Sequence, residues 1–176
     1  GFFLLSGLLL IANITGTYSI AELLNSTELI QNHSLYVLIL IFIFAGAFTK
    51  SAQFPFHFWL PGAMAAPTPV SAYLHSATMV KAGIYILARF TPVLSDGFIW
   101  NNTLMIVGGI TMIYGAFHSI FRTDMKSILA YSTVSALGII VFLLGIGTDH
   151  AIYAAVTFIL VHALYKACLF LVTGIV

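Results

Sequence analysis

Five basic side chains lie within strongly apolar stretches of this sequence: Lys50, His75, Lys81, His162 and Lys166. An ionisable side chain at membrane depth costs about 2.5 to 3.5 kcal/mol on insertion scales, so such residues usually face the interior of a helix bundle. Histidine exchanges protons near neutral pH, and burial disfavours the charged form of lysine until it can do the same. The pattern therefore indicates proton transfer inside a membrane.

The spacing of these residues predicts which of them act together. His162, Lys166 and Thr173 follow an i, i+4, i+11 pattern, which places them on one face of a helix. His75 and Lys81 are six residues apart, about 120° around a continuous helix, and are expected to serve neighbouring helices. Each polar side chain has an alternative interpretation, in which it only forms hydrogen bonds between packed helices.

Lys50 lies just before a predicted break in its helix. Phe54-Pro55 and Leu60-Pro61 follow it, and each proline removes a backbone donor and disfavours helix at the preceding residue. Breaks of this kind line cavities in transporters. The alternative is a lysine that reaches the membrane surface from a helix end.

Asp124 and Lys126 follow Arg122 at a predicted helix start, where a carboxylate favours the positive end of the helix dipole. Capping and topology account for this pair, and a role in a proton path is the alternative. His33, His57 and His150 are interpreted as loop or interface residues.

The composition fixes the class of protein that positions these residues. The 176 residues are 61% hydrophobic and 6% charged, with a mean hydropathy of +1.08, whereas a soluble domain is about 25% charged. The sequence predicts an all-α, polytopic transmembrane bundle with a broken helix, formed as a single domain over residues 1–176. Five or six spans fit, and the expected ones cover residues 1–12, 35–52, 70–90, 104–121, 128–146 and 151–176, with a loop over 13–34 and a short re-entrant piece over 56–64.

Basic residues in short loops mark the cytoplasmic side of a membrane protein. Arg122 and Lys126 therefore predict that their connection is inside, together with the loop around His57. Arg89 near an outer end argues weakly against this orientation. Four acidic residues belong to the loops expected outside: Glu22, Glu28, Asp96 and Asp149.

Several kinds of site are excluded by what the sequence lacks. Cys168 is the only cysteine, so no disulfide or cysteine metal centre is expected. The sequence has no His-Glu-x-x-His or Gly-x-Ser-x-Gly motif and no nucleotide-binding loop, and it predicts no cofactor. A net charge of +1 without a basic patch argues against a nucleic-acid partner.

Four segments resemble the antiporter-like family of proton-translocating membrane subunits: residues 46–61, 66–83, 124–135 and 162–170. The first contains Lys-Ser-Ala-Gln-Phe-Pro at 50–55, and the second contains Pro-Thr-Pro-Val-Ser at 67–71. The family includes the A-type subunits of multisubunit sodium/proton antiporters and the large antiporter-like subunits of NADH:quinone oxidoreductase (complex I). Phe-His-Phe at 56–58 and Lys81 are more similar to the A-type antiporter subunits.

The resemblance implies a longer chain with two inverted repeats, each containing a broken helix, of which this sequence would hold about helices six to eleven. Gly1 and Val176 both lie in apolar runs, and the chain is expected to continue at both ends. By resemblance, Lys50 matches the broken-helix lysine and His75 a connecting histidine. His162 and Lys166 match a pair that leads towards a second half-channel.

Asp124 and Lys126 match a charged pair of the family. Some members carry a further histidine where this chain has Phe158. The glutamate that partners the broken-helix lysine and the lysine of the second broken helix do not lie in these residues.

The leading hypothesis is proton and cation translocation, as a subunit of a multisubunit Na+/H+ antiporter in the cell membrane. Its partners would be other membrane subunits, protons, sodium and the lipid bilayer. The first alternative is a proton-pumping subunit of complex I, in which the chain would be a translocase only as part of the whole complex. The second is a passive scaffold, which would tolerate replacement of its buried lysines.

Overall fold

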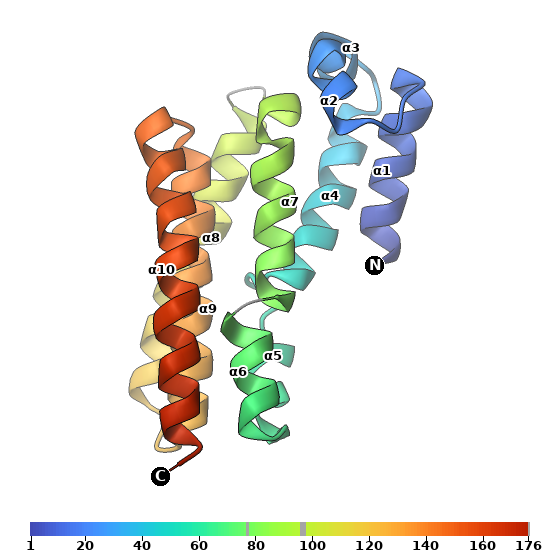
Figure 1. The fold of residues 1–176 in the computed structure, drawn as a ribbon. Coiled ribbons are helices and arrows are strands. Elements are labelled where there is room, and N and C mark those ends of the chain that lie inside the picture. The colour runs from blue at the N-terminus through green and yellow to red at the C-terminus, as the bar shows by residue number, and fades with distance from the viewer. Residues whose placement is uncertain (77, 96–97, 176) are drawn as a thin grey trace.

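The computed structural model describes residues 1–76, 78–95 and 98–175, which form a bundle of helices (Figure 1). Its main helices are α1 (Phe2–Thr15), α4 (Tyr36–Lys50), α6 (Thr68–Ser76), α7 (Met79–Leu94), α8 (Ile99–Ile120), α9 (Met125–Ile146) and α10 (Asp149–Thr173). Shorter pieces are α2 (Ile20–Leu23), the 3-10 turn Leu24–Ser26, α3 (Thr27–Gln31), α5 (Trp59–Gly62) and the 3-10 turn Ala63–Ala65. The described residues contain no strand, as the sequence predicts.

Four segments are long and apolar enough to cross a membrane: Thr68–Leu94, Ile99–Ile120, Met125–Ile146 and Asp149–Thr173. A fifth is obtained when Phe2–Thr15 and Ile20–Gln31, bent by 64°, count as one span. Helix α4 is apolar but only 15 residues long, because it ends at the break after Lys50. The expected five or more spans are thus reached only with the bent pair, and the ends of α8, α9 and α10 lie within a few residues of those predicted.

The predicted loop over residues 13–34 is wrong in part, because it contains α2 and α3. These short helices lie at the upper end of α4, beside the upper end of α1 (Figure 1). Leu23 and Ile30 are buried there, and Gln31 donates a side-chain hydrogen bond to the carbonyl oxygen of Ser95 at 3.0 Å. Burial of two apolar side chains and this bond to the end of α7 fix a segment that its polar composition suggested was loop.

The predicted break after Lys50 is confirmed. Helix α4 ends there, and Ala52 has a φ of 50°, in the left-handed region that non-glycine residues rarely adopt. The carbonyls at the end of the helix keep partners: Ser51 N–H bonds to Ala47 at 2.9 Å, Gln53 N–H to Phe48 at 3.0 Å, and Trp59 Nε1–H to Thr49 at 2.9 Å. These three carbonyls at the end of α4 are therefore satisfied, and the helix end is a defined structure and not a frayed one.

The span predicted over residues 70–90 is found within Thr68–Leu94, where the structure assigns two helices, α6 and α7, and residue 77 lies outside the described residues. Helix α6 ends at Ser76 and α7 begins at Met79, with Thr78 at φ −123° and ψ −78°. Gly83 brings α7 very close to the first break, since a Cβ there would meet the carbonyl oxygen of Ala47 at 2.3 Å. The 120° angle expected between His75 and Lys81 assumes one straight helix and does not apply.

Helices α8 and α9 pack antiparallel at unusually short range. A Cβ on Gly108 would meet Phe142 N at 2.5 Å, and one on Gly138 would meet Met112 N at 2.5 Å. Small residues at a helix contact let two backbones approach closely, which is how membrane helices gain packing energy without a hydrophobic effect between them.

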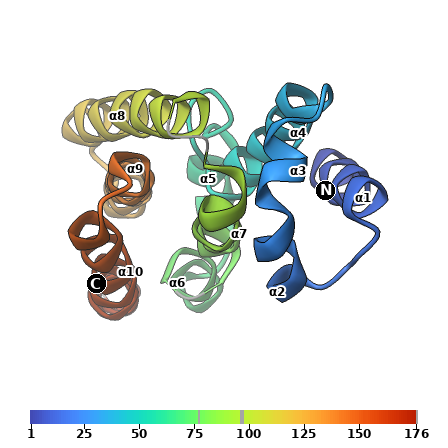
Figure 2. The ribbon, with the colours of Figure 1, turned by 90° about the horizontal axis from the view of Figure 1, so that it is seen from above.

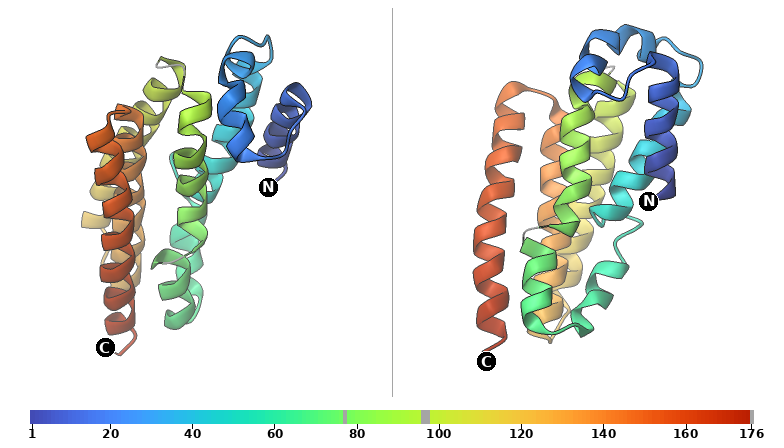
Figure 3. Two further views of the ribbon diagram at one scale, coloured as in Figure 1. Left: turned by 45° about the horizontal axis from the view of Figure 1, so that its top comes forward. Right: turned by 45° about the vertical axis from the view of Figure 1, so that its right-hand side comes forward.

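Seen from above, α9 lies between α8 and α10, and α6 and α7 lie beside them (Figure 2). The α8–α9 connection and α5 lie at one end of the bundle, and α2, α3 and the α9–α10 connection lie at the other (Figures 1 and 3). This is the alternation that the charge pattern predicts. The predicted loop residue Asp96 lies outside the described residues.

Candidate functional site

Four of the predicted site residues come together around the interruption between α6 and α7. His75 lies in the last turn of α6, Lys81 in the first turn of α7, and His162 and Lys166 on α10. Their exposed fractions are 0%, 8%, 0% and 2%. The i, i+4 pattern on α10 thus faces protein, as predicted, although the helix leaves many of its apolar side chains exposed. Thr173, further along α10, is half-buried.

Lys166 is held by the neighbouring helix α9. Its ammonium donates to the carbonyl oxygen of Leu129 at 3.0 Å and to the hydroxyl of Ser132. The ammonium also lies 5.9 Å from the centre of the Tyr165 ring. A charged group that is removed from both water and lipid keeps two oxygen partners in this way, which makes its burial tolerable.

The two buried histidines, unlike Lys166, lack hydrogen-bond partners for their side-chain polar atoms among the residues that the structure describes. Within the described residues, neither ring nitrogen of His75 or of His162 has a hydrogen-bond partner. The charges of Lys81, Lys166 and His75 all act on His162, so the four groups form one electrostatic cluster. Buried polar atoms are nearly always satisfied by protein or ordered water. The four unpaired nitrogens can therefore accept hydrogen bonds from ordered water or donate them to it.

Lys50 does not belong to this cluster by direct contact. It is the last residue of α4 and is partly exposed. Its ammonium has no hydrogen bond or ion pair within the part of the chain that the structure describes. Its place at the C-terminal end of a helix is electrostatically favourable for a cation. The chemistry predicted for it requires an acceptor from outside these residues.

Asp124 and Lys126 lie at the α8–α9 connection. One carboxylate oxygen of Asp124 accepts the Ser127 N–H at 2.9 Å and caps α9. This bond, helped by the Lys126 charge, holds the pKa of the exposed carboxyl below its usual value. Lys126 reaches the carbonyl oxygen of Ala66 at 3.4 Å, beside the start of α6. The capping interpretation is thus confirmed by a contact, and the cap and the central cluster are separate features.

The position of His57 differs from the sequence-based interpretation of a loop or interface residue. Its side chain is only 8% exposed and packs against the ring of Tyr114 at 4.3 Å between centroids. Its neighbours Phe56 and Phe58 favour the interface interpretation of His57 in the sequence, because aromatic residues are typical of a membrane interface. The signal that indicates burial is its position inside the break, seven residues after Lys50.

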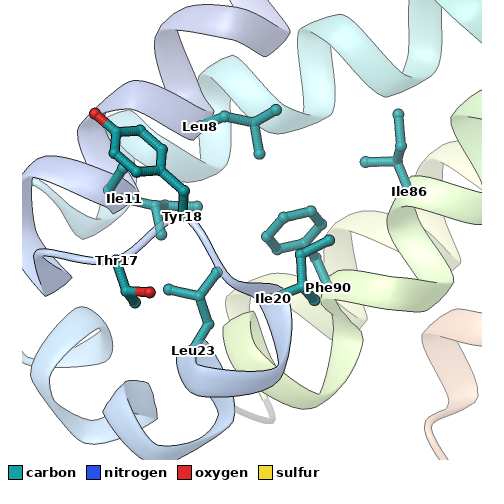
Figure 4. Close-up of a pocket in the computed structure, with 9 residues that line it drawn as sticks. Leu8, Ile11, Thr17, Tyr18, Ile20, Leu23, Ile86 and Phe90 are labelled. Atoms are coloured by element: carbon teal, nitrogen blue, oxygen red, sulfur yellow. The ribbon is translucent and has the colours of Figure 1, made fainter.

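The cavities separate the polar part of the bundle from the apolar part. A cavity of about 280 Å³ between α1, α2 and α7 is lined almost wholly by apolar side chains, with Thr17 and Tyr18 at its edge (Figure 4). No charged or histidine side chain lines it in the described part of the chain. A groove of about 480 Å³ between α7 and α10 is also lined mainly by apolar surface, but Lys81 and Arg89 take part in its lining with Tyr85, Ala88, Val156 and Ile159. Lys81 thus joins the buried cluster to an open groove.

Metal binding has no support in the described ranges, where no three His, Cys, Asp or Glu side chains come together in a way that could hold an ion. The lone Cys168 is exposed on α10.

Relatives of known name share this sequence over nearly its whole length. The chain is 52% identical over 170 residues to a probable K(+)/H(+) antiporter subunit of type A/B from Rhizobium meliloti, covering 97% of this chain and 17% of that protein. It is 48% identical over 187 residues to the Na(+)/H(+) antiporter subunit of type A from Bacillus subtilis, covering 100% of this chain and 23% of that one. The chain therefore spans about a fifth of the length of these relatives.

A solved structure has the same fold. A chain of the Mrp complex from Dietzia sp. DQ12-45-1b superposes with a TM-score of 0.83 at 44% identity, covering 94% of this chain and 18% of that one. Residues 1–176 also match the family described as NADH:quinone oxidoreductase/Mrp antiporter, transmembrane region. Because the match covers every residue, and the fold agrees with it, the chain belongs to this family of membrane proteins.

Proposed function

We propose that this chain is the proton-conducting part of a multisubunit cation/proton antiporter of the cell membrane. The observation that carries the proposal is the buried cluster of His75, Lys81, His162 and Lys166, in which two histidines keep unpaired nitrogens beside two lysines. Ionisable residues inside a membrane bundle are costly, and they usually serve an ion path.

The arrangement suggests how a proton moves. His75 and His162 each gain a proton on one ring nitrogen and lose a different proton from the other, with water bridging the gaps. Lys166 holds a proton against the Leu129 carbonyl and the Ser132 hydroxyl, and its charge acts on both histidines. A proton on Lys166 therefore repels one on His162, so the occupancy of one station sets that of the next.

Lys50 is proposed as the station at the break, where its proton responds to groups contributed by the rest of the protein. Lys126, which contacts the Ala66 carbonyl beside α6, and the capping residue Asp124 are proposed to shape the surface at the same end of the bundle as α5.

The exchanged cation and the partners are proposed from the relatives. The two named above are called K(+)/H(+) and Na(+)/H(+) antiporter subunits, so we propose exchange of protons for sodium or potassium. Other membrane subunits and the lipid bilayer would cover the many exposed apolar side chains of α1, α8 and α10.

A second candidate is a proton-pumping membrane subunit of NADH:quinone oxidoreductase, which the family description also names. In such a complex other subunits would carry the electrons. The two candidates differ in what drives proton flux, which is a cation gradient in the first and NADH oxidation in the second.

The test is proton flux in vesicles that contain the complete complex, started by a sodium or potassium gradient. Lys166→Ala is expected to lower the flux by about a hundredfold or more, the scale on which positioned proton carriers act. His150→Ala changes an exposed residue at the start of α10 and is the matched control. Cation-driven flux that is unchanged in an assembled Lys166→Ala complex contradicts the proposal, and flux that depends on NADH alone supports the second candidate.

A further inference from the structure

A second line of titratable rings lies on the other side of α9 from the central cluster. The Tyr114 ring on α8 lies 4.3 Å from that of His57 and 3.9 Å from that of His118, measured between centroids. His118 in turn lies 5.6 Å from the ring of Tyr131 on α9. Four ionisable side chains, one from the break, two from α8 and one from α9, therefore form a continuous row in which each ring packs against the next.

The tautomer of His118 follows from its contact with the backbone. Its Nδ1 lies 3.1 Å from the carbonyl oxygen of Tyr114, which can only accept a hydrogen bond. Nδ1 must therefore carry the hydrogen, and Nε2 is left as the atom that can take up a proton. When Nε2 is protonated, the imidazolium keeps the same bond to the carbonyl.

The outer end of this line is at the α8–α9 connection. Arg122 is exposed, and its Nη2 donates to the hydroxyl oxygen of Tyr131 at 2.9 Å. Its guanidinium also lies 4.7 Å from the centre of the same ring. Because arginine can only donate, the tyrosine must direct its own O–H elsewhere.

The inner end reaches the break after α4. Within the described residues, Nδ1 of buried His57 and Oε1 of buried Gln53 have no hydrogen-bond partner. Gln53 is three residues after Lys50. The break is fastened to the same face of α8, since Phe54 N–H donates to the Thr111 hydroxyl at 2.9 Å. Buried polar atoms left open within one short segment are typical of a site for water.

Helix α9 keeps the two sets of titratable groups apart. Tyr131 is directed to His118 and Arg122, whereas the adjacent Ser132 bonds to Lys166 on α10. The line along α8 therefore does not simply extend the His162–Lys166 pair. It leads from the membrane surface to the broken helix.

We propose that His118, Tyr114 and His57 form a proton-transfer branch between the surface at the α8–α9 connection and the break beside Lys50. The proposal rests on the proposed function and adds a route to it. Each imidazole gains a proton on one nitrogen and loses one from the other, with water or the tyrosine hydroxyl between them, so only N–H and O–H bonds form and break. No electrons are transferred. The ionisable rings that pack against His118 are those of Tyr114 and Tyr131, and the charge of His118 also acts on His57.

Two substitutions of His118 separate proton transfer from packing. His118→Asn keeps a donor for the Tyr114 carbonyl, and His118→Phe keeps the stacked ring, but neither can carry a proton. Both are expected to lower cation-driven proton flux in vesicles with the complete complex, by about a hundredfold or more per assembled complex. The controls are His150→Asn, at an exposed histidine, and Phe117→Leu, which alters the ring beside His118. Both controls should transport normally.

Normal flux in either His118 variant overturns the branch, since it would show that the hydrogen bond or the ring alone suffices. Where the His118 variants do not assemble, His57→Asn tests the other end, and normal flux in that variant has the same meaning. Lys166→Ala is measured in parallel. Loss of flux in Lys166→Ala with normal flux in the His118 variants contradicts only the branch, whereas normal flux in Lys166→Ala contradicts the proposed function.

Discussion

Lys166 on α10 donates a hydrogen bond to the main-chain carbonyl of Leu129 on α9, at 3.0 Å. The same carbonyl accepts the hydroxyls of Ser132 at 3.0 Å and Thr133 at 2.8 Å. A carbonyl oxygen has two lone pairs, so these donors compete for it. The ammonium of Lys166 therefore shares the Leu129 carbonyl with two hydroxyl groups that can rotate to other acceptors. Ser132 competes for that carbonyl as a donor and also accepts a hydrogen bond from Lys166.

Removal of the Ser132 hydroxyl should weaken this junction. Ser132→Ala leaves Lys166 with the Leu129 carbonyl alone, and the loss of a hydrogen bond to a charged group is expected to destabilise the complex by about 1.5 to 3 kcal/mol. Ser132→Thr keeps a hydroxyl and is the matched control. The measurement is equilibrium unfolding in mixed micelles. Equal stability of the two variants would show that the hydroxyl is not used.

The contact between α8 and α9 gives a second prediction. Gly138→Ala would place a Cβ 2.5 Å from Met112 N and 2.8 Å from the Gly108 carbonyl oxygen, so the two backbones must separate. Overpacking of this kind costs about 1 to 3 kcal/mol. Gly109→Ala is the control on the facing helix, because its Cβ would meet only the Phe142 ring at 3.7 Å. Thermal unfolding should show a lower midpoint for Gly138→Ala only.

Most of the fold could be predicted from hydropathy and the prolines. The break after Lys50 is marked by Pro55 and Pro61, and α9 and α10 are apolar runs with clear ends. The interruption before Met79 could not be predicted, because Thr78 and its neighbours include neither proline nor glycine. The close approach of α7 to the end of α4 at Gly83 was not predictable either, because it joins segments that are distant in the sequence.

The candidate site was predictable to the same degree. The spacing of His162 and Lys166 is sufficient to place them on one inward face, and both are buried. Leu129 was not predictable as a partner of Lys166, since it contributes only its carbonyl, which carries no signal in a side-chain pattern. The other partner, Ser132, is a polar side chain in an apolar helix and is visible in the sequence. His118 is visible in the sequence as a polar residue that could extend a path inward, but its connection to His57 through Tyr114 was not predictable, because it joins segments 61 residues apart.

The cap on α9 predicts a pH dependence. The folded-state pKa of Asp124 lies below its unfolded value, which is about 3.9 for a free aspartate. The cap therefore contributes its full stability above about pH 4, and that contribution is lost as the pH falls through the folded-state value. Hydrogen exchange at the start of α9, corrected for intrinsic rates, should show protection that declines in this acidic range.

Asp124→Ser gives the comparison, since serine caps a helix about as well as aspartate and does not titrate. Protection in this variant should be similar to that of the parent protein near pH 7 and should not fall with acid. The same acid-dependent loss in both proteins would assign the effect to another group.

Lys50 gives the sharpest test, because its position allows a purely structural role. As the last residue of α4 it places a positive charge at the negative end of a helix dipole, which arginine would do equally well. A lysine that passes protons cannot be replaced in this way, since the guanidinium group does not release its proton in the working range. Lys50→Arg should therefore stop cation-driven proton flux as completely as Lys50→Ala, while assembly and stability of the Arg variant stay normal. Flux near the parent level in an assembled Lys50→Arg complex would show that Lys50 acts only through its positive charge at the end of α4.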